Sequence, residues 1–171
     1  MNSNLIESIS RVCKILTKHS VQYLIVGGAS VAFYGYYRLS TAPTGLPAEK
    51  YDFDFWYNPS YGNYFNLLNA LEELGQDVSE FKKEQTPDPY KSFFRFELEI
   101  ATIDFLPSVP GLSKFSNSYK NKEVVNIQEV EINIISYDDL IISKKANARQ
   151  KDIEDINQLD LKRNKSQDNK E

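Results

Sequence analysis

The heptapeptide "KYDFDFW", residues 50–56, places two carboxylates inside a run of aromatic side chains. On a β-strand, successive side chains point to opposite faces, so Phe53 and Phe55 share one face. Asp52 and Asp54 share the other. Neighbouring carboxylates repel each other and are costly to bury. The aromatic face is therefore expected in a core, and the acidic face is expected either in water or beside a positive charge.

Composition limits the class of protein. The chain has 171 residues, which is enough for one sizeable core but too short for two. Its formal net charge of −4 argues against broad affinity for nucleic acid, although a local basic patch stays open. Cys13 has no partner for a disulfide, the N-terminus carries no leader pattern, and no apolar run approaches the ~20 residues that span a bilayer. We expect a cytoplasmic protein without a membrane partner.

Periodicity outside this heptapeptide predicts helices and strands in alternation. Helices are predicted over residues 4–18, 29–37, 64–74 and 137–161. Strands are predicted over 21–28, 51–57, 92–98 and 100–106, with a further pair within 122–136. Two prolines and a glycine predict a loop over 39–50, and the apolar-free stretch 162–171 predicts a disordered tail. The fold class is therefore α/β (α+β), a mixed β-sheet flanked by helices in a single domain over 1–161.

Two further stretches bear on the aspartates. In "VGGAS", Gly27 and Gly28 join a strand to a helix, where backbone N–H groups can approach an anion and Ser30 can add a hydroxyl. A tight strand-to-helix turn would need the same glycines. In "TIDFLP", Asp104 lies between apolar neighbours, as in a strand that directs a carboxylate into a site. Carboxylates that converge from two strands favour a divalent cation between them, and oxygen ligands suit Mg²⁺.

Cations follow in "DLIISKKANARQKDIEDI", residues 139–156. On one continuous helix, Lys144, Lys151 and Asp155 fall on one stripe, because offsets of 7 and 11 residues return to nearly the same angle. A solvated charged face would show the same spacing. Lys144 adjoins an apolar run and is expected to point at a pocket, whereas Lys145, rotated by about 100°, is expected to face away.

Together, "YLIVGGASVAFYGYYR", "YDFDFW", "IDFL" and "LIISKKANARQKDIEDI", within residues 23–159, resemble the nucleotidyltransferase superfamily with its DNA polymerase beta-like fold. The chain is most similar to the small bacterial branch that includes abortive-infection and toxin–antitoxin nucleotidyltransferases. The order of the motifs carries the resemblance: Gly-Gly before a helix, Asp-x-Asp on a strand, and a later single Asp on a strand.

The resemblance implies a Mg²⁺-dependent transfer of a nucleoside monophosphate from a triphosphate such as ATP to a hydroxyl, with release of pyrophosphate. The acceptor would be an RNA 3′ end, a protein or a small molecule, and a cognate partner protein is implied as well. A non-catalytic binding module or antitoxin is the alternative. The implied metal and catalytic residues are Asp52, Asp54 and Asp104, and the implied nucleotide-binding residues are Gly27, Gly28, Ser30, Arg38 and Lys144.

One stretch departs from the branch. An Arg-x-Thr pattern there leads almost directly into the Asp-x-Asp strand, whereas Arg38 and Thr41 are followed here by "APTGLPAEK". Three interpretations stay open: a surface insertion, which loops tolerate at little cost, a lid over the substrate, or a displacement of Arg38 that weakens activity.

Overall fold

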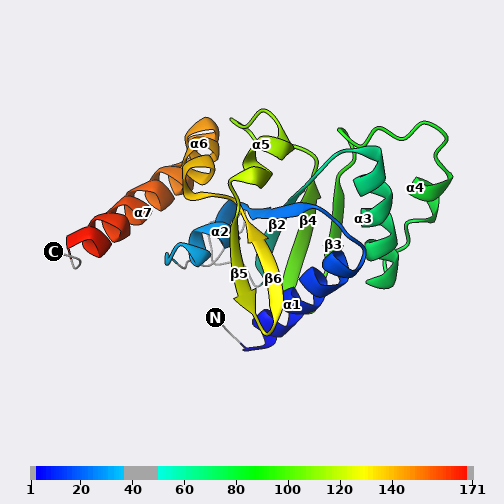
Figure 1. Cartoon of the computed structure of the whole chain (residues 1–171), viewed down its shortest axis with the longest axis horizontal. Helices are drawn as coiled ribbons and strands as arrows, with labels where there is room; N and C mark the ends of the chain where they lie inside the picture. Colours follow the sequence, from blue (N-terminus) through cyan, green and yellow to red (C-terminus); the bar gives the residue numbers. More distant parts are fainter. Residues whose placement is uncertain (1–2, 37–49, 169–171) are drawn as a thin grey trace.

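The computed structural model describes residues 3–36 and 50–168 (Figure 1). The helices among them are α1 Ser3–Lys18, α2 Gly27–Phe33, α3 Tyr61–Glu73, α4 Ser79–Lys83, α5 Phe115–Lys120, α6 Tyr137–Asn147 and α7 Gln150–Asp168. The strands are β1 Tyr23–Val26, β2 Tyr51–Tyr57, β3 Phe94–Glu97, β4 Ala101–Leu106, β5 Glu123–Ile127 and β6 Val130–Ile134. The loop predicted over 39–50 lies almost entirely outside the described residues.

The strands form one mixed six-stranded sheet in the order β3-β4-β2-β1-β6-β5. β2 pairs with β4 in parallel and with β1 antiparallel, and β1 pairs with β6 in parallel. The two outer strands, β3 and β5, join their neighbours as antiparallel hairpins. The predicted fold class is confirmed. The strands that carry the glycines and the aspartates, β1, β2 and β4, are direct neighbours.

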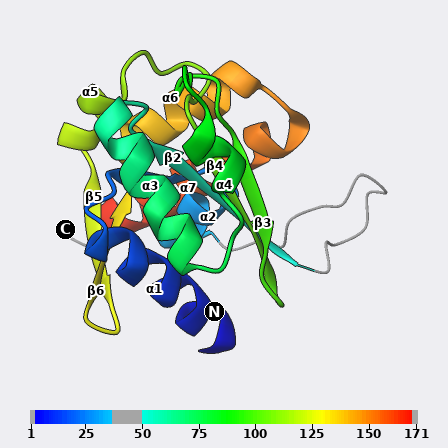
Figure 2. The ribbon, with the colours of Figure 1, turned by 90° about the vertical axis from the view of Figure 1, so that its right-hand side faces the viewer.

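One face of the sheet is the aromatic core. Phe55 is fully buried, and its ring centroid lies 5.3 Å from that of Tyr23 on β1 and 5.0 Å from that of Phe105 on β4. α1 and α3 lie side by side over this face (Figure 2). Aromatic rings bury a large area per residue, so this face supplies much of the hydrophobic stabilisation. The alternation in residues 50–56 thus assigns the core face correctly.

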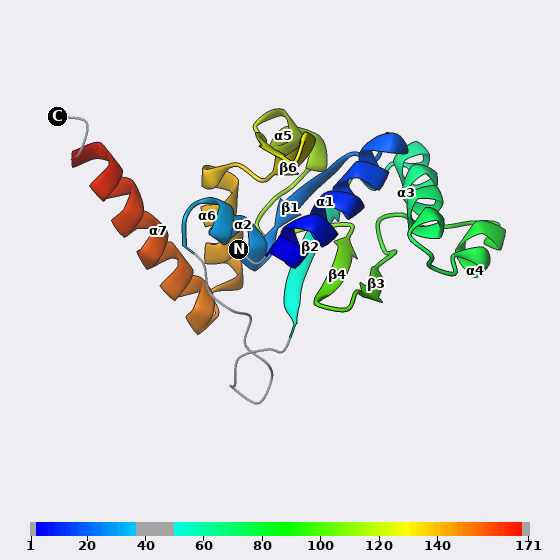
Figure 3. The same ribbon diagram turned by 90° about the horizontal axis from the view of Figure 1, so that it is seen from below.

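The opposite face is covered at one end and open at the other. Trp56 packs edge-on against Phe115 of α5 and donates its indole N–H to the Pro107 carbonyl at 3.2 Å. α2 packs against β2 and α6 on this side of the sheet (Figure 3). Asp52, four residues before Trp56 on the same face, is exposed. The open end therefore coincides with the acidic part of β2.

Two hairpins turn without glycine, which explains why the sequence carries no clear turn signal for them. Gln128 and Glu129 join β5 to β6 with φ values of 50° and 63°. Between β3 and β4, the Leu98 N–H donates to the Ala101 carbonyl at 2.7 Å.

The helix predicted over 137–161 is two helices, and this corrects the prediction that Lys144, Lys151 and Asp155 share one stripe. α6 ends where Ala148 adopts a left-handed conformation (φ 49°), and α7 begins at Gln150. Lys144 instead meets α7 across the break. Its Nζ lies 3.0 Å from Asp152 Oδ1 and 2.7 Å from Asp155 Oδ2, and its side chain is 4% exposed.

α7 continues to Asp168 and extends away from the sheet (Figures 1 and 3). The disordered tail predicted over 162–171 is thus wrong for residues 162–168, which continue the helix that begins at Gln150. None of the helices among residues 3–36 and 50–168 combines the length and apolarity needed to cross a membrane.

Lys144→Met is expected to destabilise the protein by about 3–5 kcal/mol, because it leaves the buried Asp152 and Asp155 without their shared cation. Lys145→Met is the matched control. Lys145 is the next residue along the helix and its side chain is exposed, so its loss should change the free energy of unfolding by less than about 0.5 kcal/mol. Urea unfolding of both variants measures this. Equal effects would contradict the role of Lys144 in joining the two helices.

Candidate active site

Parallel pairing of β2 with β4 brings the three predicted aspartates to one face of the sheet. Asp54 and Asp104 are direct partners in the register, and Asp52 lies opposite Thr102, two residues earlier on the same face. Asp52 is exposed, whereas Asp54 and Asp104 are half-buried. The register follows from the alternation on both strands, because any slip by one residue would turn the aspartates into the aromatic core.

Asp54 is a carboxylate whose ionised form is disfavoured by this arrangement. Burial, with the charges of Asp104 and Asp52 as smaller causes and those of Lys144 and Lys151 in opposition, raises its pKa from 3.8 to about 6. A carboxylate whose ionised form is disfavoured by its like-charged neighbours is one that an added cation would stabilise. The carboxylate oxygens on this face are of the donor type that Mg²⁺ prefers.

Gly27 lies directly against this carboxylate. Its φ is +65°, a region that L-residues rarely adopt, and a Cβ placed on it would lie 2.1 Å from Asp54 Oδ2. The antiparallel register that pairs Val26 with Asp54 produces this approach. Gly27 thus forms a close turn beside the acidic face, and Gly28 follows it as the second residue of α2.

Ser30, for which a triphosphate contact is predicted, is engaged within the turn, and that contact stays a prediction. Its side chain is fully buried and its Oγ donates to the Gly27 carbonyl at 2.8 Å. A hydroxyl has one proton to donate, so Ser30 would have to break this bond before it could donate to a phosphate oxygen. Ser30 holds the Gly27 turn in place.

Arg95 is a member of the site that sequence reasoning missed. It lies on β3 as the register partner of Asp104, its Nε 2.7 Å from Asp104 Oδ1 and its NH2 group 2.5 Å from Oδ2. The alternation in "FFRFE" already sets Arg95 opposite to Phe94 and Phe96. Its contact with Asp104 depends on the turn after Glu97, for which the sequence has no clear signal.

Among residues 3–36 and 50–168, no group of three or more His, Cys, Asp or Glu side chains is arranged to hold a metal ion. The pairing with Arg95 supplies a physical reason, since both oxygens of Asp104 accept hydrogen bonds from the guanidinium. The backbone thus brings the carboxylates together, and one of them is engaged elsewhere.

The cations of α6 and α7 are also distributed differently from the prediction. Lys144, predicted to bind the triphosphate, is enclosed between Asp152 and Asp155, so its charge is already paired. Arg149 is paired with Asp152 at 2.6 Å, and Lys145 is exposed as expected. Lys151 is half-buried, its charge acts on Asp54, and within the described part of the chain it has no ion-pair partner. Arg38 lies outside the described residues.

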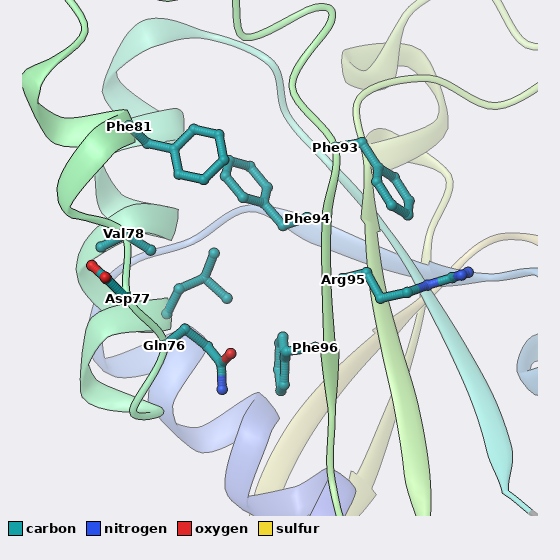
Figure 4. A pocket seen from close by; sticks show the side chains of 9 residues that line it. Gln76, Asp77, Val78, Phe81, Phe93, Phe94, Arg95 and Phe96 are labelled. Atoms are coloured by element: carbon teal, nitrogen blue, oxygen red, sulfur yellow. The ribbon is translucent and has the colours of Figure 1, made fainter.

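A separate pocket of about 220 Å³ lies between β3 and the α3–α4 region and is lined largely by apolar side chains. Phe94 and Phe96 point into it, whereas Phe93 and Arg95 point to the other side of β3 (Figure 4). This pocket adjoins the aromatic face, so it is distinct from the acidic face.

The comparisons with known proteins agree with this geometry. Residues 3–168 match the model of a family described as "Nucleotidyltransferase of unknown function (DUF6036)". The chain belongs to this nucleotidyltransferase family.

A solved structure supports the fold. The crystal structure of an antigenic nucleotidyltransferase-like protein from Paracoccidioides brasiliensis is similar to this chain, with a TM-score of 0.53 and 14% sequence identity. The match covers 93% of this chain and 77% of that one. No curated protein sequence matches the chain.

Asp54→Asn is expected to stabilise the metal-free protein at pH 7.5 by about 1–3 kcal/mol and to have little effect near pH 4. The folded pKa of Asp54 is raised from 3.8 to about 6, so the wild type loses stability as the pH rises between these values, and the neutral amide does not. Urea unfolding at several pH values in the presence of a chelator measures the difference. A gap that stays constant with pH would contradict the assignment.

Gly27→Ala is expected to cost at least about 1–2 kcal/mol of folding stability, because the methyl group would meet Asp54 and the backbone is left-handed. Gly62→Ala is the control: it lies in α3, a Cβ there meets nothing within 4 Å, and it should stabilise by up to about 1 kcal/mol. Urea unfolding of the two variants tests both signs. A neutral Gly27→Ala would show that the carboxylate is not held against the turn.

Proposed function

We propose that the protein is a divalent-cation-dependent nucleotidyltransferase that transfers a nucleoside monophosphate from a nucleoside triphosphate to a hydroxyl acceptor. The observation that carries the proposal is the register of β2 and β4, which sets Asp54 beside Asp104 with Asp52 on the same face. Membership of a nucleotidyltransferase family makes that acidic face the candidate for the chemistry. Such a reaction consumes nucleoside triphosphates, which supports a cytoplasmic location.

In this proposal the three carboxylates bind one or two Mg²⁺ ions. Bound Mg²⁺ would offset the charge of the phosphates and stabilise the attacking and leaving oxygens. The acceptor oxygen forms a bond to the α-phosphorus, the bond from that phosphorus to the bridging oxygen breaks, and pyrophosphate leaves. Gly27 and Gly28 provide the close backbone beside the phosphates. Asp104 would lie next to the acceptor hydroxyl.

We assign the triphosphate-binding cation to Lys151 in place of Lys144. A triphosphate brings about four negative charges to a face that already holds three carboxylates, so a protein cation with a free charge is needed. Lys144 is buried between two carboxylates of α7. The charges of both lysines act on Asp54, but Lys151 is half-buried and has no ion-pair partner among the residues that the structure describes.

The acceptor classes in this proposal are an RNA 3′ end, a protein and a small molecule, and the wider role is in a toxin–antitoxin or phage-defence system. One observation favours the alternative of a non-catalytic module of the same fold: Asp104 is bound by Arg95 through both oxygens. A module of that kind would not need Asp104 for a cation, whereas an enzyme requires that Arg95 can leave.

Asp54→Asn and Lys151→Gln are each expected to weaken binding of a Mg²⁺–triphosphate at least tenfold, a loss of about 1.4 kcal/mol. Lys145→Gln is the control that removes one charge from the exposed side of α6 and should bind as the wild type does. Titration calorimetry with each of the four triphosphates measures the affinities. Unchanged affinity in Asp54→Asn would contradict the metal assignment.

Activity is then tested with α-labelled triphosphates, Mg²⁺ and cell extract. We expect label to pass to a macromolecule or small molecule with the wild type and not with Asp54→Asn. Ribonuclease and protease digestion of the product distinguishes RNA, protein and small-molecule acceptors. Asp54-dependent binding of Mg²⁺–triphosphate without transfer would favour the binding module.

A further inference from the structure

Arg95 approaches the acidic face from the edge of the sheet. β3 is the outermost strand on this side, and its antiparallel register with β4 sets Arg95 directly beside Asp104. Phe94 and Phe96 on either side of it are buried in the core, which anchors the strand and directs Arg95 to the opposite side (Figure 4). The position of the guanidinium therefore follows from the packing of β3.

The contact between Arg95 and Asp104 differs from an ordinary surface ion pair. Both oxygens of the carboxylate are engaged, at 2.7 and 2.5 Å, and the side chain of Asp104 is only 13% exposed. Bidentate arginine–carboxylate pairs are among the stronger and more directional hydrogen-bonded pairs in proteins. Asp104 thus has its negative charge and its oxygen atoms committed to Arg95.

The charge of the Arg95 guanidinium acts on all three aspartates of the acidic face. The hydrogen bond and charge of Asp104 raise the pKa of Arg95, and the charges of Asp52 and Asp54 raise it further. A guanidinium stays positively charged at any pH at which proteins fold, so Arg95 brings a permanent charge to Asp104 from β3. Lys144 and Lys151 act on Asp54 from α6 and α7.

A divalent cation and this guanidinium compete for the same oxygens. A metal ion that binds Asp104 would have to take one of the oxygens that now accept a hydrogen bond from Arg95, and the two positive charges would repel each other. Because the side chain of Arg95 is 59% exposed on an edge strand, it has room to leave. The ring of Phe93, whose centroid lies 5.7 Å from the Arg95 Cζ, offers the displaced guanidinium a partner on the same side.

We propose that Arg95 is a built-in counter-ion of the carboxylate site: it holds Asp104 in the nucleotide-free protein and must release it before a divalent cation can bind all three aspartates. This deepens the proposed function and rests on it for the identity of the cation. Arg95 is a positioning residue here, acting through Asp104. It makes the nucleotide-free protein a weak metal binder, so that the metal enters together with the nucleotide.

The test measures Mn²⁺ binding to the full chain without nucleotide, by electron paramagnetic resonance or titration calorimetry. Arg95→Gln is expected to bind Mn²⁺ at least about fivefold more tightly than the wild type, because the competitor for Asp104 is gone. Lys50→Gln is the matched control. Lys50 also pairs with β3, through Glu97 at 2.7 Å, and its loss removes the same charge without touching Asp104. Circular dichroism and urea unfolding confirm that each variant is folded.

A double-mutant cycle shows whether the effect acts through Asp104. In the Asp104→Asn background, adding Arg95→Gln should raise Mn²⁺ affinity by much less than it does when Asp104 is present, because only the longer-range charge of Arg95 is then removed. Equal Mn²⁺ affinity in wild type and Arg95→Gln, or an equal gain in Lys50→Gln, would overturn the inference. So would an Arg95→Gln variant that loses triphosphate affinity with no change in Mn²⁺ affinity, since Arg95 would then be a phosphate ligand.

The two proposals fail separately. Tighter Mn²⁺ binding in Arg95→Gln through Asp104, without nucleotidyl transfer by any variant, would support the counter-ion and reject the enzyme. Transfer by the wild type together with unchanged Mn²⁺ binding in Arg95→Gln would do the reverse.

Discussion

The parallel pairing of β2 with β4 is the constraint on which the acidic face depends. It sets Asp54 beside Asp104 on one face and, on the other, stacks Phe55 against Phe105. The same register therefore has two consequences: it buries aromatic side chains, which stabilises the fold, and it brings carboxylates together, which destabilises it. Burying the aromatic side chains is favourable by several kcal/mol, whereas the repulsion between the carboxylates is partly offset by cations. The fold can hold a charged site because the core on the opposite face stabilises the strands that carry it.

Cations approach this face from two directions, and each is held differently. Arg95 comes from the edge strand β3 and binds Asp104 directly. Lys144 comes from α6 and is enclosed by Asp152 and Asp155 of α7, with Arg149 as a further partner of Asp152. That cluster has two positive and two negative charges, and its ion pairs join α6 to α7 across the break. Lys151 lies in the first turn of α7, so the junction between α6 and α7 determines its position.

Local sequence was sufficient for the core face and the backbone of the site. The alternation in residues 50–56 depends only on the strand period, and Gly27-Gly28 marks a turn that other residues would strain, so both were predictable. The helix break at Ala148 was not, because a left-handed alanine carries no compositional signal and is stabilised there by the ion pairs of Lys144 across the junction. Predicting one helix placed Lys144 and Lys151 on one stripe and missed the enclosure of Lys144 between Asp152 and Asp155.

Arg95 was missed for a related reason. Its contact with Asp104 spans only nine residues, yet it requires the exact register of a hairpin whose turn lacks a glycine. Which residues form an ion pair depends in general on the tertiary structure, because a charged residue in a sequence has many possible counter-ions. Charge balance still narrows the choice: three carboxylates that share a face need compensation, and an arginine on the adjacent strand with the same facing is the nearest source. Once the register is known, the pairing of Arg95 with Asp104 follows from electrostatics alone.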